Sequence, residues 1–275
     1  MRQITILDLL KLKQQGDKFT CVTAYDATFA RQINQAGVDT ILVGDSLGMV
    51  LQGHNDTLPV TMSDMVYHTR AASRGKGNSL LISDMPFMSY GTPEQALLNA
   101  AELMRAGAQM IKLEGGDWLC DSIHLLQQRG IPVCAHLGLT PQSVNVFGGF
   151  RVQGKTPDTA ERIARDARLV EEAGASALLL ECVPQSLAAQ VTRESSLPVI
   201  GIGAGPDTDG QVLVLHDLLG MNPRPARFVK DFLSESSSIQ DALQAFDEAV
   251  QAGDRTAVEE TLAAAWSAAQ QARVE

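Results

Sequence analysis

The sequence predicts an α/β fold, and within that class a (β/α)8 barrel. Two observations indicate it: eight short apolar segments rich in β-branched residues recur along the chain, and helix-like stretches separate them. The segments begin near residues 19, 40, 80, 110, 132, 177, 198 and 212. Continuous apolar strands are expected where both faces of a sheet are covered, and alternation with helices requires parallel pairing. Eight units in 275 residues favour the barrel over an open doubly wound sheet, which the same element order also allows.

The connection after the segment at residue 80 shows the predicted helices best. Thr92 is placed to cap a helix, Pro93 stands at its first position, and Gln95 can complete a capping box. Gly107 is expected to end this helix, and the next strand follows at once.

Two regions lie outside the repeat. Residues 3–14 read as a helix that could cover the bottom of the barrel, so we assign residues 1–18 to an N-terminal helix. Residues 238–275 read as an Ala-rich helical tail, interrupted near Gly253, that packs against the barrel or a neighbouring subunit. No repeat or linker suggests a second domain, so we expect one domain over residues 1–275.

The composition excludes several classes of protein. Hydrophobic residues make up 45% of the chain and charged residues 20%, as in a soluble globular protein. The net charge is −10 without any basic cluster, which argues against a nucleic-acid partner. The chain has no signal-peptide core and no apolar run of membrane-spanning length, so we expect a cytoplasmic protein without a membrane partner.

The four cysteines, at positions 21, 120, 134 and 182, form no CxxC pair. Buried free thiols in a reducing compartment are therefore favoured over a zinc site. A catalytic Cys134, two residues before His136, remains an alternative.

Ionisable side chains follow five of the apolar runs at equivalent places. ILVG is followed by Asp45, LLIS by Asp84, MIKL by Glu114, PVCA by His136, and ALLL by Glu181. In a parallel barrel the strand ends lie on one rim, the C-terminal face, where active sites of this fold are built. A single Asp after a strand is most often a helix cap or turn former, but five converging groups predict a site.

Crowded carboxyl groups on one rim predict a bound cation. Asp45, Asp84, Glu114 and Glu181 would repel one another, and a cation or Lys112, which shares its strand face with Glu114, would offset this repulsion. Carboxylates without thiolates or paired histidines suit Mg2+, with Mn2+ as a substitute. His136 then reads as a donor to substrate or as a structural histidine.

Two further motifs have structural explanations that require no ligand or catalysis. The glycines at 201, 203 and 205 could cradle a phosphate or permit close packing, but they do not form GxGxxG. His216 and Asp217 lack the GxSxG serine of a hydrolase, so a solvated or capping role is preferred.

Six strings occur in order between about Thr20 and about Asp231: GDSLGMVLQGHNDTLPVT, SDMPFMSY, KLEGG, AHLGLTPQSVNVFGGF, LLLECVP and GIGAG. Together they resemble the ketopantoate hydroxymethyltransferase family. The resemblance implies a barrel of the phosphoenolpyruvate mutase/isocitrate lyase-like group, use of Mg2+, and a homo-oligomer, commonly a decamer in bacteria. It also implies transfer of a hydroxymethyl group from 5,10-methylenetetrahydrofolate to 3-methyl-2-oxobutanoate, which gives 2-dehydropantoate in the first step of pantothenate biosynthesis.

The resemblance further implies a role for each site residue. Glu181 looks like the base that removes the C3 proton of the keto acid, leaving an enolate that Mg2+ stabilises and that attacks the one-carbon unit. The implied metal residues are Asp45, Asp84 and Glu114, and the implied substrate contacts are Asp45, Ser46, Asp84, Lys112 and His136. The loop at residues 221–230 and the tail after 238 match the family only loosely.

Two alternatives belong to other functional classes. A lyase or mutase of the same barrel group could act on another 2-oxo acid, but such enzymes generally carry a KKCGH-like loop, which this chain lacks. A non-catalytic barrel could merely bind a keto acid, but such a module has no need of a base such as Glu181.

Overall fold

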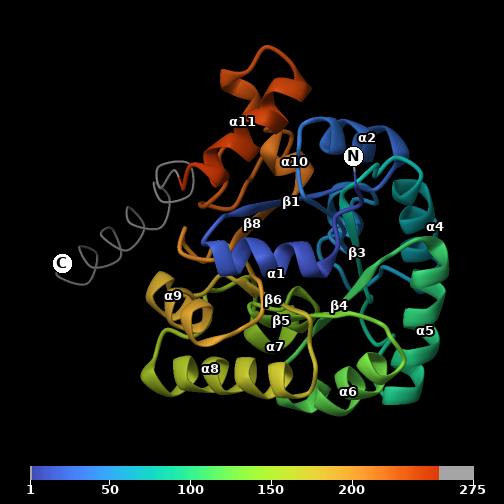
Figure 1. The fold of residues 1–275 in the computed structure, drawn as a ribbon, viewed down its shortest axis with the longest axis vertical. Coiled ribbons are helices and arrows are strands. Elements are labelled where there is room, and N and C mark those ends of the chain that lie inside the picture. Colours follow the sequence, from blue (N-terminus) through green and yellow to red (C-terminus); the bar gives the residue numbers. More distant parts are fainter. Residues whose placement is uncertain (1, 254–275) are drawn as a thin grey trace.

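The computed structural model describes residues 2–253 of the chain. Eight parallel strands pair in sequence order, and the eighth pairs with the first, so the sheet closes into a barrel (Figure 1). The strands are β1 (Phe19–Thr23), β2 (Thr40–Val43), β3 (Leu80–Asp84), β4 (Met110–Glu114), β5 (Val133–Gly138), β6 (Ala177–Glu181), β7 (Val199–Ile202) and β8 (Gly210–Leu213). The predicted (β/α)8 barrel is confirmed, and the open sheet is excluded.

Helices surround the barrel in a ring in which successive members touch. The ring consists of α11 (Ile239–Gln251), α2 (Ala27–Gln35), α4 (Met62–Ser73), α5 (Pro93–Ala106), α6 (Cys120–Gln128), α8 (Pro157–Glu172) and α9 (Gln185–Glu194). Three single-turn helices, α3 (Leu47–Val50), α7 (Val144–Phe147) and α10 (Leu215–Leu218), follow β2, β5 and β8. No described helix is long and apolar enough to cross a membrane.

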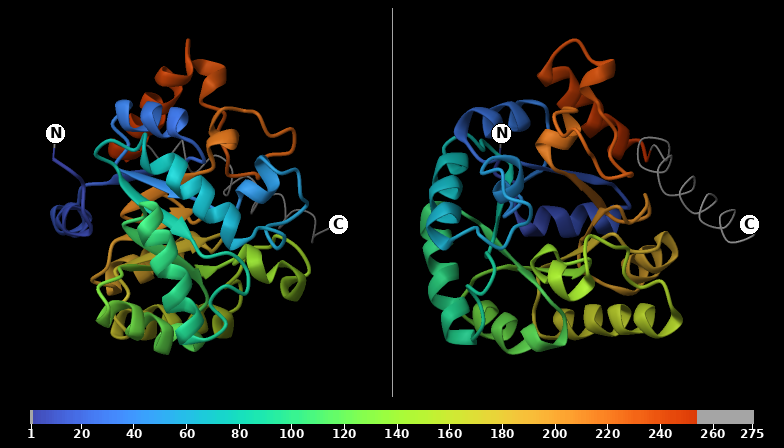
Figure 2. Two further views of the ribbon diagram at one scale, coloured as in Figure 1. Left: turned by 90° about the vertical axis from the view of Figure 1, so that its right-hand side faces the viewer. Right: turned by 180° about the vertical axis from the view of Figure 1, so that it is seen from behind.

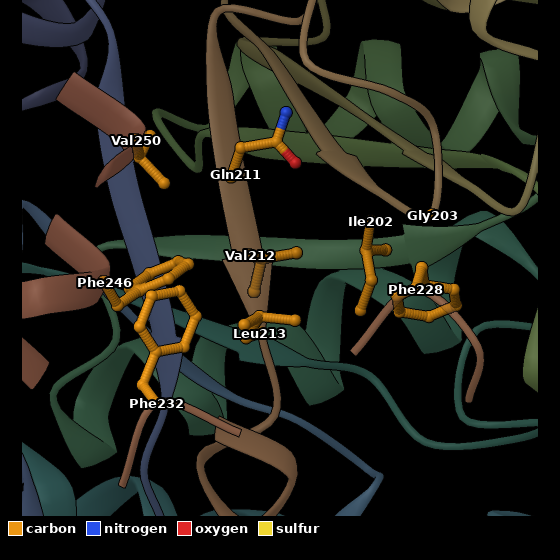
Figure 3. Close-up of a pocket in the computed structure, with 9 residues that line it drawn as sticks. All are labelled: Ile202, Gly203, Gln211, Val212, Leu213, Phe228, Phe232, Phe246 and Val250. Carbon is orange, nitrogen blue, oxygen red and sulfur yellow. The ribbon is translucent and has the colours of Figure 1, made fainter. Parts of the chain in front are cut away.

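The expected alternation of strands and helices fails between β7 and β8. Residues 203–209 connect these strands without a helix, so the ring is open between α9 and α11. A small hollow lies there, and Figure 3 shows that its lining is apolar apart from Gln211. Phe228, Phe246 and Val250 supply the apolar contacts that a connecting helix would otherwise make.

The glycines that precede β8 serve close packing. A Cβ atom on Gly203 would lie 2.7 Å from the Phe228 ring, and one on Gly205 would lie 2.5 Å from the Gln185 side chain. The amide of Gln211 donates to the Gly205 carbonyl at 2.9 Å, so the one polar group of the hollow is satisfied. These contacts favour packing over the phosphate cradle.

The predicted caps of α5 are mostly correct. Thr92 Oγ1 accepts a hydrogen bond from the Gln95 backbone N–H at 3.2 Å, and Gly107 ends the helix with φ +117°. Gln95 Oε1, however, accepts from the backbone N–H of Gly91 rather than of Thr92. The reciprocal half of the capping box therefore closes one residue earlier than predicted.

Helix α1 (Ile6–Gln15) covers the N-terminal end of the barrel, as predicted. Leu9 is fully buried against the inward-facing side chains of the strands, among them Phe19 and Met110. Figure 2 (left) shows α1 at one end of the barrel and the segments around α3 and α7 at the other. The C-terminal ends of the strands are therefore the end left for a site.

Two expectations concern thiols and the tail. Cys134 is buried in the barrel interior, and burial raises the pKa of its thiol to about 12, so it is no nucleophile. The predicted tail begins with a helix, α11, which packs against β1 and α2. The rest of the tail, and so part of the single domain expected over residues 1–275, lies outside the described residues.

Candidate active site

The ionisable residues predicted at the strand ends lie together on the C-terminal rim. In the parallel register Asp84 stands beside Lys112, and Glu114 stands beside His136. Glu181 ends the next strand, β6. The grouping arises because equivalent positions on neighbouring parallel strands are one strand spacing apart, about 4.8 Å.

Lys112 lies at the centre of the group. Its Nζ is 3.0 Å from Asp84 Oδ1, 3.6 Å from Glu114 Oε1 and 3.3 Å from His136 Nδ1, and the side chain is buried. Burial works to lower the pKa of Lys112, but the charges of Asp84, Glu114 and Asp45 raise it above its ordinary value. Lys112 is therefore a fixed positive charge inside the rim.

Asp45 joins this group through its backbone as well as its side chain. Its N–H donates to Asp84 Oδ2 at 3.1 Å, and its own Oδ2 accepts from Gln142 Nε2 at 2.8 Å. The side chain caps no helix, because Ser46 stands at the N-cap of α3. The functional interpretation of Asp45 is thus favoured over the local one.

Gln142 is a site residue that the sequence did not single out. Its amide bridges Asp45 and the carbonyl of Met85, and its backbone N–H donates to Glu114 Oε2 at 3.0 Å. The hydroxyl of Tyr90 donates in turn to Gln142 Oε1. An amide side chain gives no charge signal in a sequence, although Gln142 lies within the quoted string AHLGLTPQS.

Ser46 lies at the edge of the same site. Its Oγ is 3.0 Å from the hydroxyl of Tyr25, which comes from the loop after β1. Tyr25 was also not singled out, since it lies two residues beyond its strand. This contact orients the Ser46 hydroxyl beside Asp45.

The negative charges of the site exceed its positive charge. Burial raises the pKa of Asp84, and burial together with the charges of Asp84 and Glu114 raises that of Asp45 well above its usual range. For Glu114 burial acts in the same direction, but Lys112 and His136 outweigh it and hold its pKa below the ordinary value. One ammonium thus faces three carboxyl groups, and Asp45 is the one whose ionised form is most disfavoured.

His136 connects this centre to Glu181. Burial and the neighbouring ammonium lower the pKa of His136, so the ring is neutral at pH 7. Because the Lys112 ammonium can only donate, we infer that His136 Nδ1 accepts and that the ring proton lies on Nε2. His136 Nε2 is 3.5 Å from Glu181 Oε2 and faces it.

Glu181 has the environment of a general base. Its side chain is 18% exposed, whereas those of Lys112 and Glu114 are buried. Burial, and then the charge of Glu114, raises the pKa of Glu181 to about 8. A carboxylate with a pKa near the working pH is suited to accepting a proton from carbon.

The backbone around Glu181 is held in an uncommon geometry. Cys182 has φ +47°, a left-handed conformation that β-carbon-bearing residues seldom adopt. Its N–H donates to the Ile202 carbonyl at 2.9 Å, and the Glu181 carbonyl accepts from Leu139 N at 2.8 Å. These bonds to both neighbouring strands fix where the Glu181 side chain leaves the barrel wall.

The carboxyl groups predicted to bind metal surround Lys112. Within residues 2–253 no three His, Cys, Asp or Glu side chains form a group that could hold a metal ion as they stand. The Lys112 ammonium and the Gln142 amide lie between them.

Comparison with known proteins identifies the family. A model of the ketopantoate hydroxymethyltransferase family matches residues 3–255. The chain belongs to this family. It is 60% identical over 251 residues to 3-methyl-2-oxobutanoate hydroxymethyltransferase 2 of Hahella chejuensis, covering 91% of this chain and 95% of that protein. It is 58% identical over 262 residues to the 3-methyl-2-oxobutanoate hydroxymethyltransferase of Shewanella loihica, covering 95% and 99%.

Family membership confirms that the chain is an enzyme, a hydroxymethyltransferase of pantothenate biosynthesis. The lyase or mutase alternative and the non-catalytic alternative are thereby set aside. Solved structures share the barrel fold as well.

Phosphonopyruvate hydrolase superposes with a TM-score of 0.61 at 17% identity, covering 80% of this chain and 84% of that chain. A phosphoenolpyruvate phosphomutase from Streptomyces platensis subsp. rosaceus gives 0.60 at 16% identity, covering 94% and 91%. 2,3-Dimethylmalate lyase, a member of the PEP mutase/isocitrate lyase superfamily, superposes with a TM-score of 0.57 at 18% identity, covering 78% of this chain and 79% of that chain. At these identities the likeness extends to the fold alone.

Proposed function

We propose that the chain transfers a hydroxymethyl group from 5,10-methylenetetrahydrofolate to 3-methyl-2-oxobutanoate, giving 2-dehydropantoate and tetrahydrofolate with uptake of one water. The observation that carries the mechanism is that one rim holds both a partly exposed carboxyl of raised pKa, Glu181, and a buried ammonium, Lys112. Removal of a proton from carbon beside a ketone requires both a base and a positive charge near the oxygen.

The site residues divide the work between binding and proton transfer. Lys112 pairs closely with Asp84 at 3.0 Å but more loosely with His136 and Glu114, at 3.3 and 3.6 Å, so its ammonium would turn from a looser partner to a carboxylate or ketone oxygen of the keto acid. Ser46 would donate to the same acid from the C-terminal end of β2. Glu181 would take the C3 proton, and His136 Nε2, 3.5 Å from Glu181 Oε2, stands beside the carboxyl group.

The residues fit a Mg2+ ion, with Mn2+ as a substitute. Asp84 Oδ1 and Glu114 Oε1 are buried and receive no well-aligned hydrogen bond, and burial with the neighbouring carboxyl groups raises the pKa of Asp45, which a cation would lower. Asp45 and Asp84 would hold the ion, directly or through water, and Glu114 would stand behind them, since Mg2+ binds through one or two carboxylates plus waters and substrate oxygens. When bound, Mg2+ would polarise the keto acid and offset negative charge that develops on its oxygen.

The proposed assembly and cellular location rest on membership of the family. We propose a cytoplasmic homo-oligomer, a decamer as in bacterial members of the family. Large apolar side chains stand exposed on the touching helices α4 and α5, namely Tyr67 and Leu98, each 70% exposed, and these are suited to contacts between copies.

A two-step assay tests the proposed function. The purified chain is mixed with 3-methyl-2-oxobutanoate and Mg2+ in deuterated water, and loss of the C3 proton signal is followed by NMR. Methylenetetrahydrofolate is then added, and formation of 2-dehydropantoate is measured. Exchange followed by product formation supports the proposal, whereas cleavage of the keto acid or the absence of both signals would refute it.

The raised pKa of Glu181 predicts the pH dependence of the reaction. A base works ionised, so below its pKa the rate falls about tenfold per pH unit. We expect kcat/KM for C3 exchange to rise with pH, with a midpoint well above 4.5. The midpoint should be no higher than about 8, because a cation beside Glu114 would lower the pKa of Glu181. Exchange rates at low keto acid concentration between pH 5 and 9 would test this. A flat profile throughout would contradict the assignment of Glu181.

A further inference from the structure

One large aromatic side chain on the rim is left unused by the mechanism above. Trp118 belongs to the 3-10 helix η1 (Asp117–Leu119), which follows β4 and its last residue, Glu114. Its side chain is 58% exposed. An exposed indole near the ionisable rim offers a flat apolar surface on which a ring can stack.

The Trp118 ring has two contacts that hold it. The ring of Tyr90 stacks on it with centroids 5.9 Å apart and planes inclined by 13°. A Cβ atom on Gly115 would lie 2.5 Å from Trp118 Nε1, so the indole edge rests on the backbone next to Glu114. The indole is thus held in place while much of its surface faces solvent.

The platform formed by Trp118 and Tyr90 is tied to the reaction centre. The Tyr90 hydroxyl donates to Gln142 Oε1, and the Gln142 amide donates to Asp45 Oδ2 at 2.8 Å. Two hydrogen bonds therefore fix the distance between the stacked rings and the carboxyl groups. A flat ligand on the platform would sit in a defined position relative to the keto acid.

We propose that the exposed surface of Trp118 binds the pterin ring of the one-carbon donor by stacking. The inference rests on the proposed function, in which a methylene group carried on a flat, bicyclic ring must approach the rim. Aromatic side chains stack well on such rings, typically changing affinity by one to two powers of ten. The loop that carries Tyr90 also exposes Phe87, at 45%, and Met88, at 61%, which would border the ring.

A guanidinium lies near Trp118, where the other end of the donor could reach it. Folates carry a glutamate tail, which is anionic at pH 7. Arg165 of α8, with 53% of its side chain exposed, lies 3.5 Å from Asp117, the neighbour of Trp118. Arg165 is also 3.4 Å from Asp166, so a tail carboxylate would bind this guanidinium in competition with Asp117 and Asp166, and stacking on Trp118 carries the proposal.

Binding can be measured directly because the sequence contains only two tryptophans, Trp118 and Trp266. In the variant Trp266→Phe, Trp118 is the sole source of indole fluorescence. Titration of this variant with tetrahydrofolate, the unreactive product, is expected to quench that fluorescence with saturation. Unchanged emission at concentrations that saturate the enzyme in the transfer assay would overturn the proposal.

Kinetics of Trp118→Leu provide the second test. We expect its KM for methylenetetrahydrofolate to rise about 10-fold to 100-fold, and that of Trp118→Phe to rise less, because a smaller ring still stacks. Exchange of the C3 proton without folate should change less than about threefold, since Trp118 does not contact the keto acid residues. Leu7→Ala, which removes an exposed apolar side chain from α1 at the other end of the barrel, is the control and should leave both quantities unchanged.

The outcomes separate this inference from the proposed function. A wild-type chain without exchange or transfer would refute the function. A normal wild type with an unchanged folate KM in Trp118→Leu would refute the platform alone. Equal loss of exchange and transfer in Trp118→Leu, or a change in molar mass by light scattering, would assign Trp118 to structure or to a contact between copies and would also overturn the platform.

Discussion

Replacing Glu181 with Gln is expected to slow C3 proton exchange and hydroxymethyl transfer by about 10²-fold to 10⁴-fold, the usual contribution of a general base. The amide keeps the shape of the side chain and its contact with His136 Nε2, but it cannot accept the proton. Binding of the keto acid should change little, because Lys112 and Ser46 are untouched. Exchange is followed by NMR, and keto acid binding by calorimetry with Mg2+ present.

The matched control is Glu194→Gln, which changes an exposed carboxyl on α9 that pairs with Arg168 at 3.6 Å. Its effect on either rate should be within twofold. If Glu181→Gln exchanged the C3 proton at the wild-type rate, another residue would be the base, and the pH profile predicted from Glu181 would no longer apply.

Replacing Lys112 with Met is expected to lower both stability and activity. The change leaves Asp84 and Glu114 buried without their positive partner, a loss of about 3–5 kcal/mol in the free energy of unfolding if both stay ionised. The carboxyl groups relieve part of this by taking up protons, because Lys112 lowers the pKa of each. Urea unfolding at pH 8, where protonation helps least, should show the largest loss.

Two comparisons isolate the charge of Lys112. The control Lys230→Met removes an exposed ammonium, 3.0 Å from Glu235, and should cost at most about 1 kcal/mol. The double variant Lys112→Met with Asp84→Asn should regain part of the lost stability, because one uncompensated charge is gone. If Lys112→Met were as stable as the wild type and the double variant less so, the charge balance described for the rim would be wrong.

Much of the barrel could be predicted because its signals are local. Each strand is a continuous apolar run, and Thr92, Pro93 and Gly107 mark the start and end of the helix after β3. The missing helix between β7 and β8 could not be predicted in this way. What replaces it, the packing of α11 and Phe228, comes from residues far along the chain.

The candidate site was predictable to the extent that it consists of charges at strand ends. Asp84, Lys112 and Glu181 stand where apolar runs stop, so the sequence marks them. No such pattern distinguishes Gln142 and Trp118, because a neutral amide or an indole can occur in a core as well as in a loop. They were found only through their contacts with Asp45 and Tyr90.

By itself the sequence determined the barrel, the rim on which its ionisable residues lie, and the family, because strand period and strand ends are set by neighbouring residues. Only the tertiary structure decided that Lys112 lies among Asp84, Glu114 and His136, and that Asp45 and Glu181 have raised pKa values. These properties depend on burial and on distances of a few ångströms between residues of different strands. Electrostatic energies vary with just those quantities, and no local pattern in a sequence records them.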